Sequence, residues 1–258
     1  MNNEKILKIA MRQQAIDFNC EPEDFCKKEN KVVISKENPE ARAYLKLPFF
    51  CAFASFGNNI VASVNAVIAE MVLEYINRHK IEDCFAPPNL FILNDELQKH
   101  GKRIGFSAQR FLPDINIIKP ISCEYEIKIL YPDDYAYLYN LPEWSNAIGS
   151  GKRKHLDRLA AGAYDGQKLI GLVGSEACCD SMWQIGFDVM PKYRRKGVAS
   201  ALTSRLALEI LHIGKVPFSG NLWANIPSFK TQFTSGFRPA WVEMMTVDSA
   251  DTIINMNQ

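Results

Sequence analysis

The stretch Val189–Ala199, VMPKYRRKGVA, joins an extended run to a helix and organises the second half of the chain. An extended pattern ends at Val189, a basic turn follows, and apolar residues then recur at helical spacing from Val198 to His212. The first N–H groups of a helix have no intrahelical acceptor, and the helix dipole is positive there. A strand, a basic turn containing Gly197 and a helix start therefore predict an anion-binding loop that suits phosphate.

The turn differs from two common phosphate loops. No GKS or GKT follows a glycine at Walker spacing, and the dinucleotide fingerprint needs three glycines after a strand. Instead, Arg194, Gly197 and Ala199 resemble the coenzyme A pyrophosphate loop of the GNAT acyltransferase superfamily: Gln or Arg, two residues, Gly, one residue, Gly or Ala. The alternative for this match alone is a basic surface turn before a helix.

A second signature follows about 30 residues later. The run WANIPSFKTQFTSGF resembles the GNAT segment in which an Asn precedes a short helix that ends in Gly-Phe. Asn225 suits the N-cap, Pro227 the first turn and Gly236 the end of that helix. The longer runs DSMWQIGFDVMPKYRRKGVASAL and RQQAIDFNCEPEDF are similar to the subgroup that contains the zwittermicin A resistance acetyltransferase.

The resemblance covers about residues 123–247 and implies an α+β GNAT fold, with α/β layers, over a domain at 121–250. The Asp165-Gly166 dipeptide between two extended runs predicts a hairpin there. Residues 1–115 predict a mainly helical accessory domain on the substrate side, with short strands and a long helix at Ile60–Arg78. The Pro-marked connector Phe111–Pro120 is the expected boundary.

The GNAT resemblance implies acetyl-CoA as cosubstrate and no metal. It implies that the pantetheine arm adds to an exposed strand edge by main-chain hydrogen bonds. The implied contacts to pantetheine and the acetyl carbonyl are Phe187, Asp188 and Val189, and those to pyrophosphate are Arg194, Arg195, Lys196, Gly197, Val198 and Ala199. Asn225 and Ser228 are expected at the arm, and the alternative for Asn225 is a helix cap and nothing more.

Acyl transfer needs a neutral amine and a route for its proton. The candidate bases are Glu176, Asp180 and Asp188, with Glu243 a weaker fourth, and each can instead be a surface or turn carboxylate. Glu176 ranks first because it lies on a strand expected to border the acceptor groove.

One position departs from the family pattern. Where many GNAT enzymes place a Tyr that protonates the leaving thiolate, this chain has Gln232, and an amide is no general acid. Tyr193 or another Tyr then substitutes, solvent does so, or the thiolate leaves unaided. Trp144, Tyr164 and Trp183 are candidates for lining the acceptor pocket, or simply core residues.

Composition limits the function classes. The 258 residues are 47% hydrophobic and 23% charged, with a net charge of +1 that argues against a broad nucleic-acid surface. No long uncharged apolar run or cleaved secretory signal is visible, so we expect no membrane contact. Seven cysteines without metal-finger spacing suggest reduced thiols in a cytoplasm.

The sequence thus predicts a cytoplasmic, acetyl-CoA-dependent N-acetyltransferase. The expected acceptor is the amine of a small molecule, an antibiotic or metabolite, attacking directly in a ternary complex. Homodimers are common in the superfamily, so a homodimer is one of the states that the resemblance allows. The alternatives are a non-catalytic acyl-CoA sensor, which Gln232 favours, and a protein N-acetyltransferase.

Overall fold

The computed structural model describes residues 1–149 and 153–251. The chain forms two compact units. Unit 1 contains Met1–Ala10 and Phe111–Pro239, and unit 2 contains Met11–Arg110 and the chain from Ala240 onward. The chain passes between them within the helix α1 (Asn3–Phe18) and the strands β4 (Lys102–Pro113) and β10 (Phe237–Asp248).

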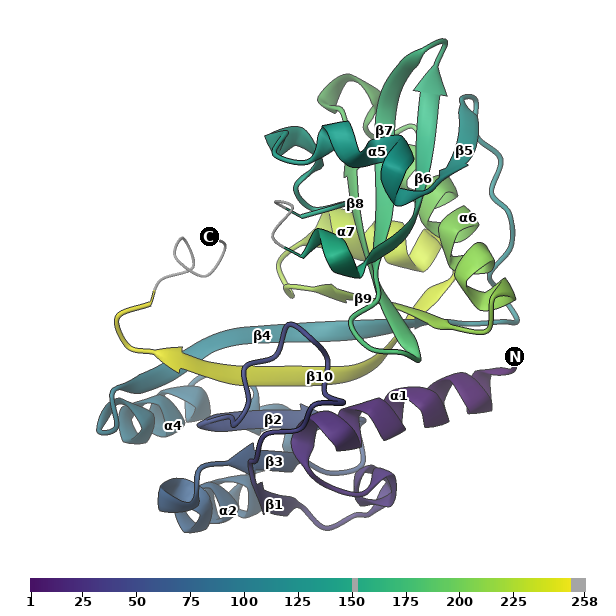
Figure 1. The fold of residues 1–258 in the computed structure, drawn as a ribbon. Coiled ribbons are helices and arrows are strands. Elements are labelled where there is room, and N and C mark those ends of the chain that lie inside the picture. The colour runs from purple at the N-terminus through teal and green to yellow at the C-terminus, as the bar shows by residue number, and fades with distance from the viewer. Residues whose placement is uncertain (150–152, 252–258) are drawn as a thin grey trace. The chain divides into compact units, whose positions relative to one another are not determined.

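Unit 1 is built on a twisted sheet with the strand order β9-β8-β7-β6-β5 (Figure 1). Neighbouring strands are antiparallel except for β8 and β9, which are parallel. The elements are β5 (Glu126–Leu130), α5 (Pro132–Tyr135), η3 (Ala136–Leu138), η4 (Pro142–Trp144), η5 (Lys154–Leu156), β6 (Asp157–Asp165), β7 (Lys168–Glu176), β8 (Met182–Val189), η6 (Pro191–Tyr193), α6 (Val198–His212), β9 (Val216–Asn221) and α7 (Ile226–Thr234).

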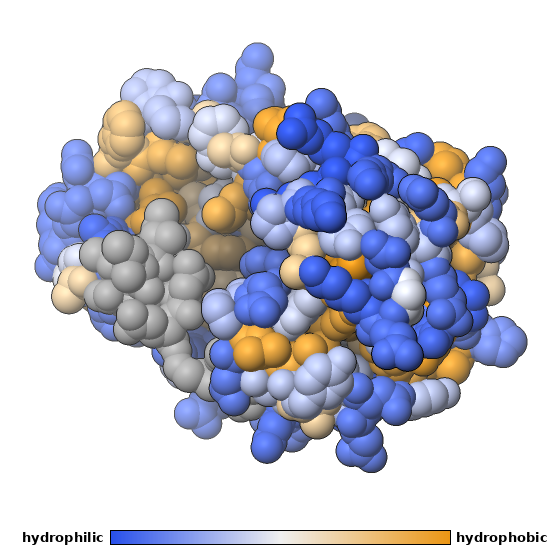
Figure 2. Space-filling model, turned by 90° about the horizontal axis from the view of Figure 1, so that it is seen from above, coloured by the Kyte–Doolittle hydropathy of each residue, from blue (hydrophilic) through white to orange (hydrophobic). Residues whose placement is uncertain are grey.

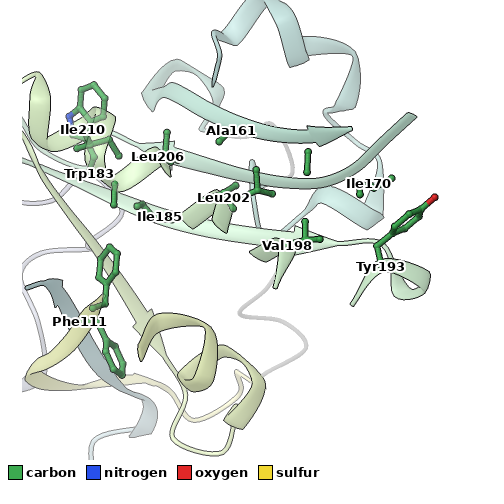
Figure 3. Close-up of a cluster of buried hydrophobic side chains, with 14 residues drawn as sticks. Phe111, Ala161, Ile170, Trp183, Ile185, Tyr193, Val198, Leu202, Leu206 and Ile210 are labelled. Atoms are coloured by element: carbon green, nitrogen blue, oxygen red, sulfur yellow. The ribbon is translucent and has the colours of Figure 1, made fainter. Parts of the chain in front are cut away.

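The helix α6 covers one face of this sheet, and its apolar side forms the main core of unit 1 (Figure 3). Val198, Leu202 and Leu206 recur at helical spacing and pack against Ile170 and Ile185 of the strands. Burying a side chain of this size stabilises the fold by roughly 1.5–3 kcal/mol. The apolar spacing that predicted this helix is therefore also what holds it on the sheet.

The other face of the unit 1 sheet is covered by the segment from α5 to Ile148. Its buried cluster contains Tyr135, Leu138, Trp144 and Ile148, packed with Leu172 of β7. The two faces of the sheet thus have different covers, a long helix on one side and short helical turns on the other.

Unit 2 is also a sheet covered on both faces. Its strand order is β1-β3-β2-β10-β4, with β1 and β3 parallel and β2 antiparallel to both β3 and β10. The remaining elements are η1 (Pro22–Cys26), β1 (Lys31–Ile34), β2 (Cys51–Ser55), β3 (Val61–Val64), η2 (Ala66–Ile68), α2 (Ala69–Arg78), α3 (Ile81–Cys84) and α4 (Asn89–Gln98). Side chains from α2 and α4 pack on one face, and Ala15 and Phe18 of α1 pack in a separate cluster with Ala52 and Ala54.

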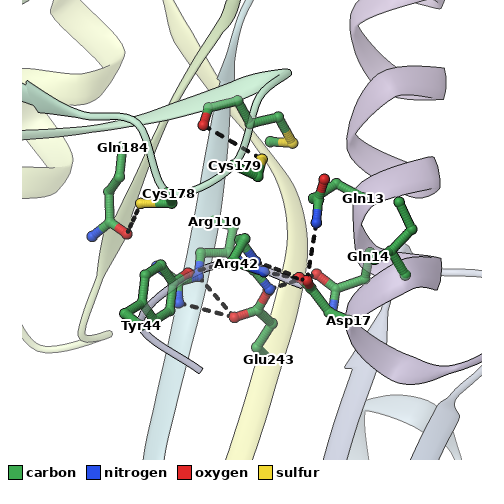
Figure 4. A network of polar contacts seen from close by, with 12 residues as sticks. Gln13, Gln14, Asp17, Arg42, Tyr44, Arg110, Cys178, Cys179, Gln184 and Glu243 are labelled. Carbon is green, nitrogen blue, oxygen red and sulfur yellow. Dashed lines mark hydrogen bonds and ion pairs between the residues drawn. The ribbon is translucent and has the colours of Figure 1, made fainter. Parts of the chain in front are cut away.

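A buried network of charges crosses unit 2 (Figure 4). Glu243 on β10 accepts hydrogen bonds from Arg42, Arg110 and the indole of Trp241 at 2.7–3.0 Å. Arg42 also pairs with Asp17 of α1 and donates to Tyr44. Although burial alone would raise it, the two guanidinium groups lower the pKa of Glu243 to about 2. The network therefore joins α1, the segment before β2, β4 and β10.

The expectation of a mainly helical N-terminal region with short strands is not confirmed, because β1, β2, β3 and β4 of that region belong to a sheet. The strand β3 occupies the start of the predicted helix Ile60–Arg78, and α2 begins only at Ala69. All residues of β2 and β3 are buried, so their apolar runs carry no alternation that would distinguish a strand from a buried helix.

The compact units also differ from the predicted ranges 1–115 and 121–250. Residues from Ala240 belong to unit 2 because β10 continues past Pro239, and Val242–Met245 pair with β2. The predicted Asp165-Gly166 hairpin is confirmed, and Gly166 has the positive φ of +60° that such a turn requires.

Hydrophilic residues cover much of the surface in Figure 2, with apolar residues in smaller groups between them. Among the described residues, the most exposed large apolar side chain is that of Trp223, 80% exposed, in the connection between β9 and α7. Within residues 1–149 and 153–251, no helix is long and apolar enough to cross a membrane.

Candidate active site

The parallel strands β8 and β9 separate halfway along their length. Their paired residues run only from Met182 with Val216 to Gln184 with Phe218. From Ile185 to Val189, β8 remains paired with β7 but has no partner on β9 in the described chain. Apart from the Val189 carbonyl, which accepts a hydrogen bond from Arg194 Nε, this half of β8 therefore presents N–H and C=O groups without a strand partner along one edge, to which an extended ligand can add as a strand would.

The unpaired edge leads directly into the predicted anion loop. Gly197 is the N-cap of α6 and has a left-handed φ of +79°, and Arg195 also has a positive φ of +60°. In the described chain, Arg194 N–H bonds to Pro191 and Ala201 N–H bonds to Gly197, but the N–H groups from Arg195 to Ala199 have no acceptor. Unpaired donors at the positive end of a fifteen-residue helix are a ready phosphate site.

The side chains of this loop are partly committed to its shape. Arg194 Nε donates to the carbonyl of Val189 at 2.8 Å, which fixes the turn against the strand end. Lys196 donates to the hydroxyl of Tyr125 at 3.2 Å. Arg194, Arg195 and Lys196 are all exposed, whereas Val198 is buried in the core. The loop therefore combines a fixed backbone with solvent-facing positive charge.

Tyr193, the expected substitute acid, lies in the core with its hydroxyl engaged. The hydroxyl donates to Asp165 of the β6–β7 turn at 2.8 Å, and this hydrogen bond raises the pKa of Tyr193. Asp165 and Glu176 terminate opposite ends of the β6–β7 hairpin. Tyr193 and Glu176 are therefore roughly 25 Å apart along β7, at about 3.3 Å per residue, and cannot act on one reacting centre.

Asn225 caps α7, as predicted. Its side-chain oxygen accepts from Ser228 N–H at 3.2 Å. Ser228 in turn donates to Asn221 Oδ1 at 2.5 Å, and the buried Asn221 Nδ2 has no partner among the described residues. Asn221 ends β9 beside the diverging strands, and the sequence offered no motif that would have singled it out.

Glu176 lies in a row of polar side chains across three strands. It pairs in register with Asp157 on β6 and with Gln184 on β8. Its carboxylate forms an ion pair with Arg153 Nε at 2.9 Å, and Tyr139 donates to Asp157 at 2.5 Å. Burial raises the pKa of Glu176, and the charge of Arg153 acts to lower it. Burial also raises the pKa of Asp157, and the hydrogen bond from Tyr139 acts to lower it.

Asp188 was expected to contact the cosubstrate or to act as the base, but its carboxylate binds protein N–H groups instead. Its carboxylate accepts hydrogen bonds from the N–H groups of Asn146 and Ala147 and from Asn146 Nδ2, at 2.7–2.9 Å. Burial raises the pKa of Asp188, and these bonds oppose that effect. The side chain thus holds the segment that follows η4, and we find it satisfied by protein donors.

The remaining candidates do not gather at this site. Asp180 is 97% exposed and pairs with Lys215, and Glu243 is enclosed in the charge network of unit 2. Gln232 is buried, and its Oε1 has no partner in the described chain. Trp144 and Trp183 are core residues on opposite faces of the sheet, so they do not line one pocket.

The separation along β8 suits a long extended ligand. Gln184, opposite Glu176, and Val189, at the loop, are five residues apart, which is roughly 17 Å at about 3.3 Å per residue. The predicted anion loop and the Glu176 row therefore lie at the two ends of the half of β8 that has no partner on β9. A molecule with an anionic end and an extended arm can reach from one to the other.

No protein-family model and no curated protein sequence matches the chain. Among similar solved structures, a GCN5-related N-acetyltransferase from Kribbella flavida aligns at 12% identity and TM-score 0.49 over 78% of this chain and 84% of that chain. A GCN5-related N-acetyltransferase-like protein from Streptococcus suis aligns at 18% identity and TM-score 0.43 over 61% and 68%. A Salmonella typhimurium protein solved with its cofactor acetyl-CoA aligns at 15% identity and TM-score 0.37 over 51% and 97%.

Other solved chains are covered less completely. The aligned part spans 66% of a GNAT-family protein from Novosphingobium aromaticivorans and 56% of one from Colwellia psychrerythraea. Because all these TM-scores lie below 0.5, a functional assignment depends on the site's own geometry.

Proposed function

We propose that the protein is an acetyl-CoA-dependent N-acetyltransferase that acts on a small-molecule amine. The observation that carries this proposal is the separation of β8 from β9 immediately before a loop of unpaired N–H groups. The separation offers an edge for the pantetheine arm, and the loop offers donors for pyrophosphate. One continuous stretch, Ile185–Ala199, supplies both.

The residues present fit this cosubstrate. Pyrophosphate is held by the N–H groups from Arg195 to Ala199, with Arg195 and Lys196 adding charge. The amides of the arm meet the main chain of Phe187 and Val189. Asn221 Nδ2, a buried donor without a partner in the described chain, lies at the β9 side of the same opening and suits an amide carbonyl.

Glu176 is the proposed proton acceptor. A protonated amine gives one proton to a carboxylate, directly or through water, and its nitrogen then attacks the thioester carbonyl. The new C–N bond forms as the C–S bond breaks and the thiolate leaves, and the attacking nitrogen, positively charged after bond formation, loses its second proton to water to give the neutral amide. Because a thiol pKa is about 8.5, the thiolate can depart without a protein acid and take its proton from water.

A burial-raised pKa suits this role. A carboxyl group with a raised pKa is a stronger base than an exposed one. Asp157, directly opposite on β6, adds a second negative charge beside Glu176. The two carboxylates attract an ammonium group, whereas Arg153, which pairs with Glu176, opposes that attraction.

The test is an assay of thiol release from acetyl-CoA with a library of small aliphatic amines. We expect amine-dependent release by the wild type, and a fall in kcat of about 10²–10⁴ in Glu176→Gln, the usual contribution of general acid–base catalysis. Asp133→Asn, which removes an exposed carboxylate from α5 of the same unit, is the matched control and should retain full activity. Equal rates in Glu176→Gln and the control would exclude Glu176 as the base.

A non-catalytic acyl-CoA sensor is the second candidate. Gln232 favours it, because the buried amide there cannot donate a proton to a leaving thiolate, and the Tyr193 hydroxyl is engaged by Asp165. A sensor would bind acetyl-CoA but release no thiol with any amine of the library. Turnover with one amine would remove this candidate.

A further inference from the structure

The segment Pro142–Ile148 is fixed to the sheet by an unusual contact. Gly174 on β7 and Gly186 on β8 are directly opposite each other in register. A Cβ on Gly174 would lie 2.2 Å from the carbonyl oxygen of Ala147, and one on Gly186 would lie 1.9 Å from that of Asn146. Both glycines are therefore required for the main chain of the segment to lie flat on the two strands.

Asp188 holds this main chain in place. It lies two residues after Gly186, so its side chain points to the same face of β8. Its three hydrogen bonds reach the same two residues, Asn146 and Ala147, whose carbonyl groups rest on the glycines. Hydrogen bonds to an ionised acceptor are stronger than neutral ones, so this carboxylate is the main polar restraint on the segment.

The segment lies on the face of the unit 1 sheet opposite α6. On the opposite face, a Cβ on Gly171 would meet the side chains of Val198 and Leu202, so α6 covers the strands there. Glu176 lies two residues after Gly174 and Gln184 two residues before Gly186, so the alternation of each strand puts both on the segment's face. At about 3.3 Å per residue, they lie roughly 7 Å beyond the glycine pair. The fixed segment thus borders the Glu176 row.

We propose that Asp188 is a positioning residue that fixes Pro142–Ile148 as the wall of the amine-binding side of the site. This inference rests on the proposed acyl transfer. Asp188 also belongs to the unpaired half of β8, one residue before Val189, whose carbonyl anchors Arg194 of the loop. The wall for the acceptor and the edge for the cosubstrate are therefore built on the same strand.

The test compares Asp188→Asn and Asn146→Ala with Asp133→Asn as control. Asp188→Asn keeps the shape of the side chain but loses its charge and replaces one acceptor oxygen with a donor. Asn146→Ala removes only the 2.7 Å side-chain bond, from an exposed residue, so it should fold in any case. Each variant is assayed for amine KM and kcat, for acetyl-CoA Kd by calorimetry, and for amide hydrogen exchange at Asn146 and Ala147.

We expect faster exchange at Asn146 and Ala147 in Asp188→Asn, with kcat/KM for the amine about tenfold lower and mainly through KM, as for the loss of one hydrogen bond to a charged group. The acetyl-CoA Kd should stay within about twofold, because the loop donors are untouched. Asn146→Ala should show a smaller change in the same direction, and the control none.

Two results would overturn the inference. Unchanged exchange in Asp188→Asn would show that the carboxylate does not hold the segment, and faster exchange with unchanged amine KM would show that the segment is no acceptor wall. If the wild type releases no thiol with any amine, the proposed function fails and the acceptor role with it. The exchange rates still decide separately whether Asp188 restrains the segment.

Discussion

Gly197 is required for its backbone conformation and not because neighbouring atoms crowd it. Its φ of +79° is left-handed, yet a Cβ placed there would meet nothing within 4 Å. The sequence suggested that a side chain at this position would block the approach of a ligand, and the space around the Cβ position is open. The residue therefore leaves the loop donors uncovered as well as setting the turn.

Substitution of Gly197 separates these two effects. Alanine in the left-handed region costs about 1–2 kcal/mol, so Gly197→Ala should shift the loop out of this conformation and weaken acetyl-CoA binding several-fold. Asparagine tolerates the left-handed region, so Gly197→Asn should keep the loop conformation. Calorimetric Kd values and thermal unfolding of both variants check this. If Gly197→Asn loses acetyl-CoA binding at unchanged stability, the added side chain itself blocks the ligand. If Gly197→Ala binds acetyl-CoA as the wild type does, the left-handed conformation is not required for binding.

Asn225 is both the cap of α7 and a proposed contact to the cosubstrate. Asn225→Ala should lose about 1 kcal/mol of stability because the cap to Ser228 N–H disappears. Asn225→Asp keeps an oxygen cap but loses the Nδ2 donor. If acetyl-CoA binds the Asp variant as well as the wild type, Asn225 is a cap and nothing more.

At the scale of elements, the sequence predicted those parts whose signals are local. The helix α6, the Asp165-Gly166 hairpin and the cap of α7 follow from apolar spacing, a turn dipeptide and an Asn at the right place, and all are present. The strands β2 and β3 are fully buried, so their apolar runs have no alternation to read. Strand pairing between residues almost two hundred positions apart, as in β2 with β10, has no local signal at all.

In the candidate site, too, features with a local sequence signal could be predicted and those that depend on strand register could not. The loop residues were predictable because they share one short stretch. Asp157 was not, because only the register of β6 against β7 brings it opposite Glu176. The use of Asp188 to hold Asn146 was likewise invisible, since the two residues are 42 positions apart and joined by a turn without a motif.

At the scale of the whole molecule, the most consequential buried charges are those of unit 2. Removing one partner of a buried ion pair leaves the other without compensation, which typically costs about 3–5 kcal/mol. Glu243→Gln leaves Arg42 and Arg110 facing a neutral amide. We expect the free energy of unfolding in urea to fall by about 3–5 kcal/mol, against no change in the exposed control Glu37→Gln. A loss below about 1 kcal/mol would mean that the network contributes little to stability.

The same network predicts a response to acid. The pKa of Glu243 is about 2 in the folded protein, below its ordinary 4.5, so its contribution is complete above about 4.5 and is lost as pH falls through 2. Burial raises the pKa of Asp17, which acts in the opposite sense, since protonation of that group favours the folded state. The difference in unfolding free energy between wild type and Glu243→Gln should therefore narrow between about pH 7 and about pH 3. A constant or widening difference would contradict the assignment.

The most direct test of the central claim is calorimetric titration of acetyl-CoA into the wild type, Gly197→Glu and Gly214→Glu. Gly214 ends α6 with a φ of +80° and open space around its Cβ, so its variant carries the same strain and charge at the other end of the same helix. We predict binding at about micromolar Kd by the wild type and by Gly214→Glu, and none by folded Gly197→Glu. Equal binding by all three proteins, or no binding by the wild type, would contradict the phosphate loop and the function built on it.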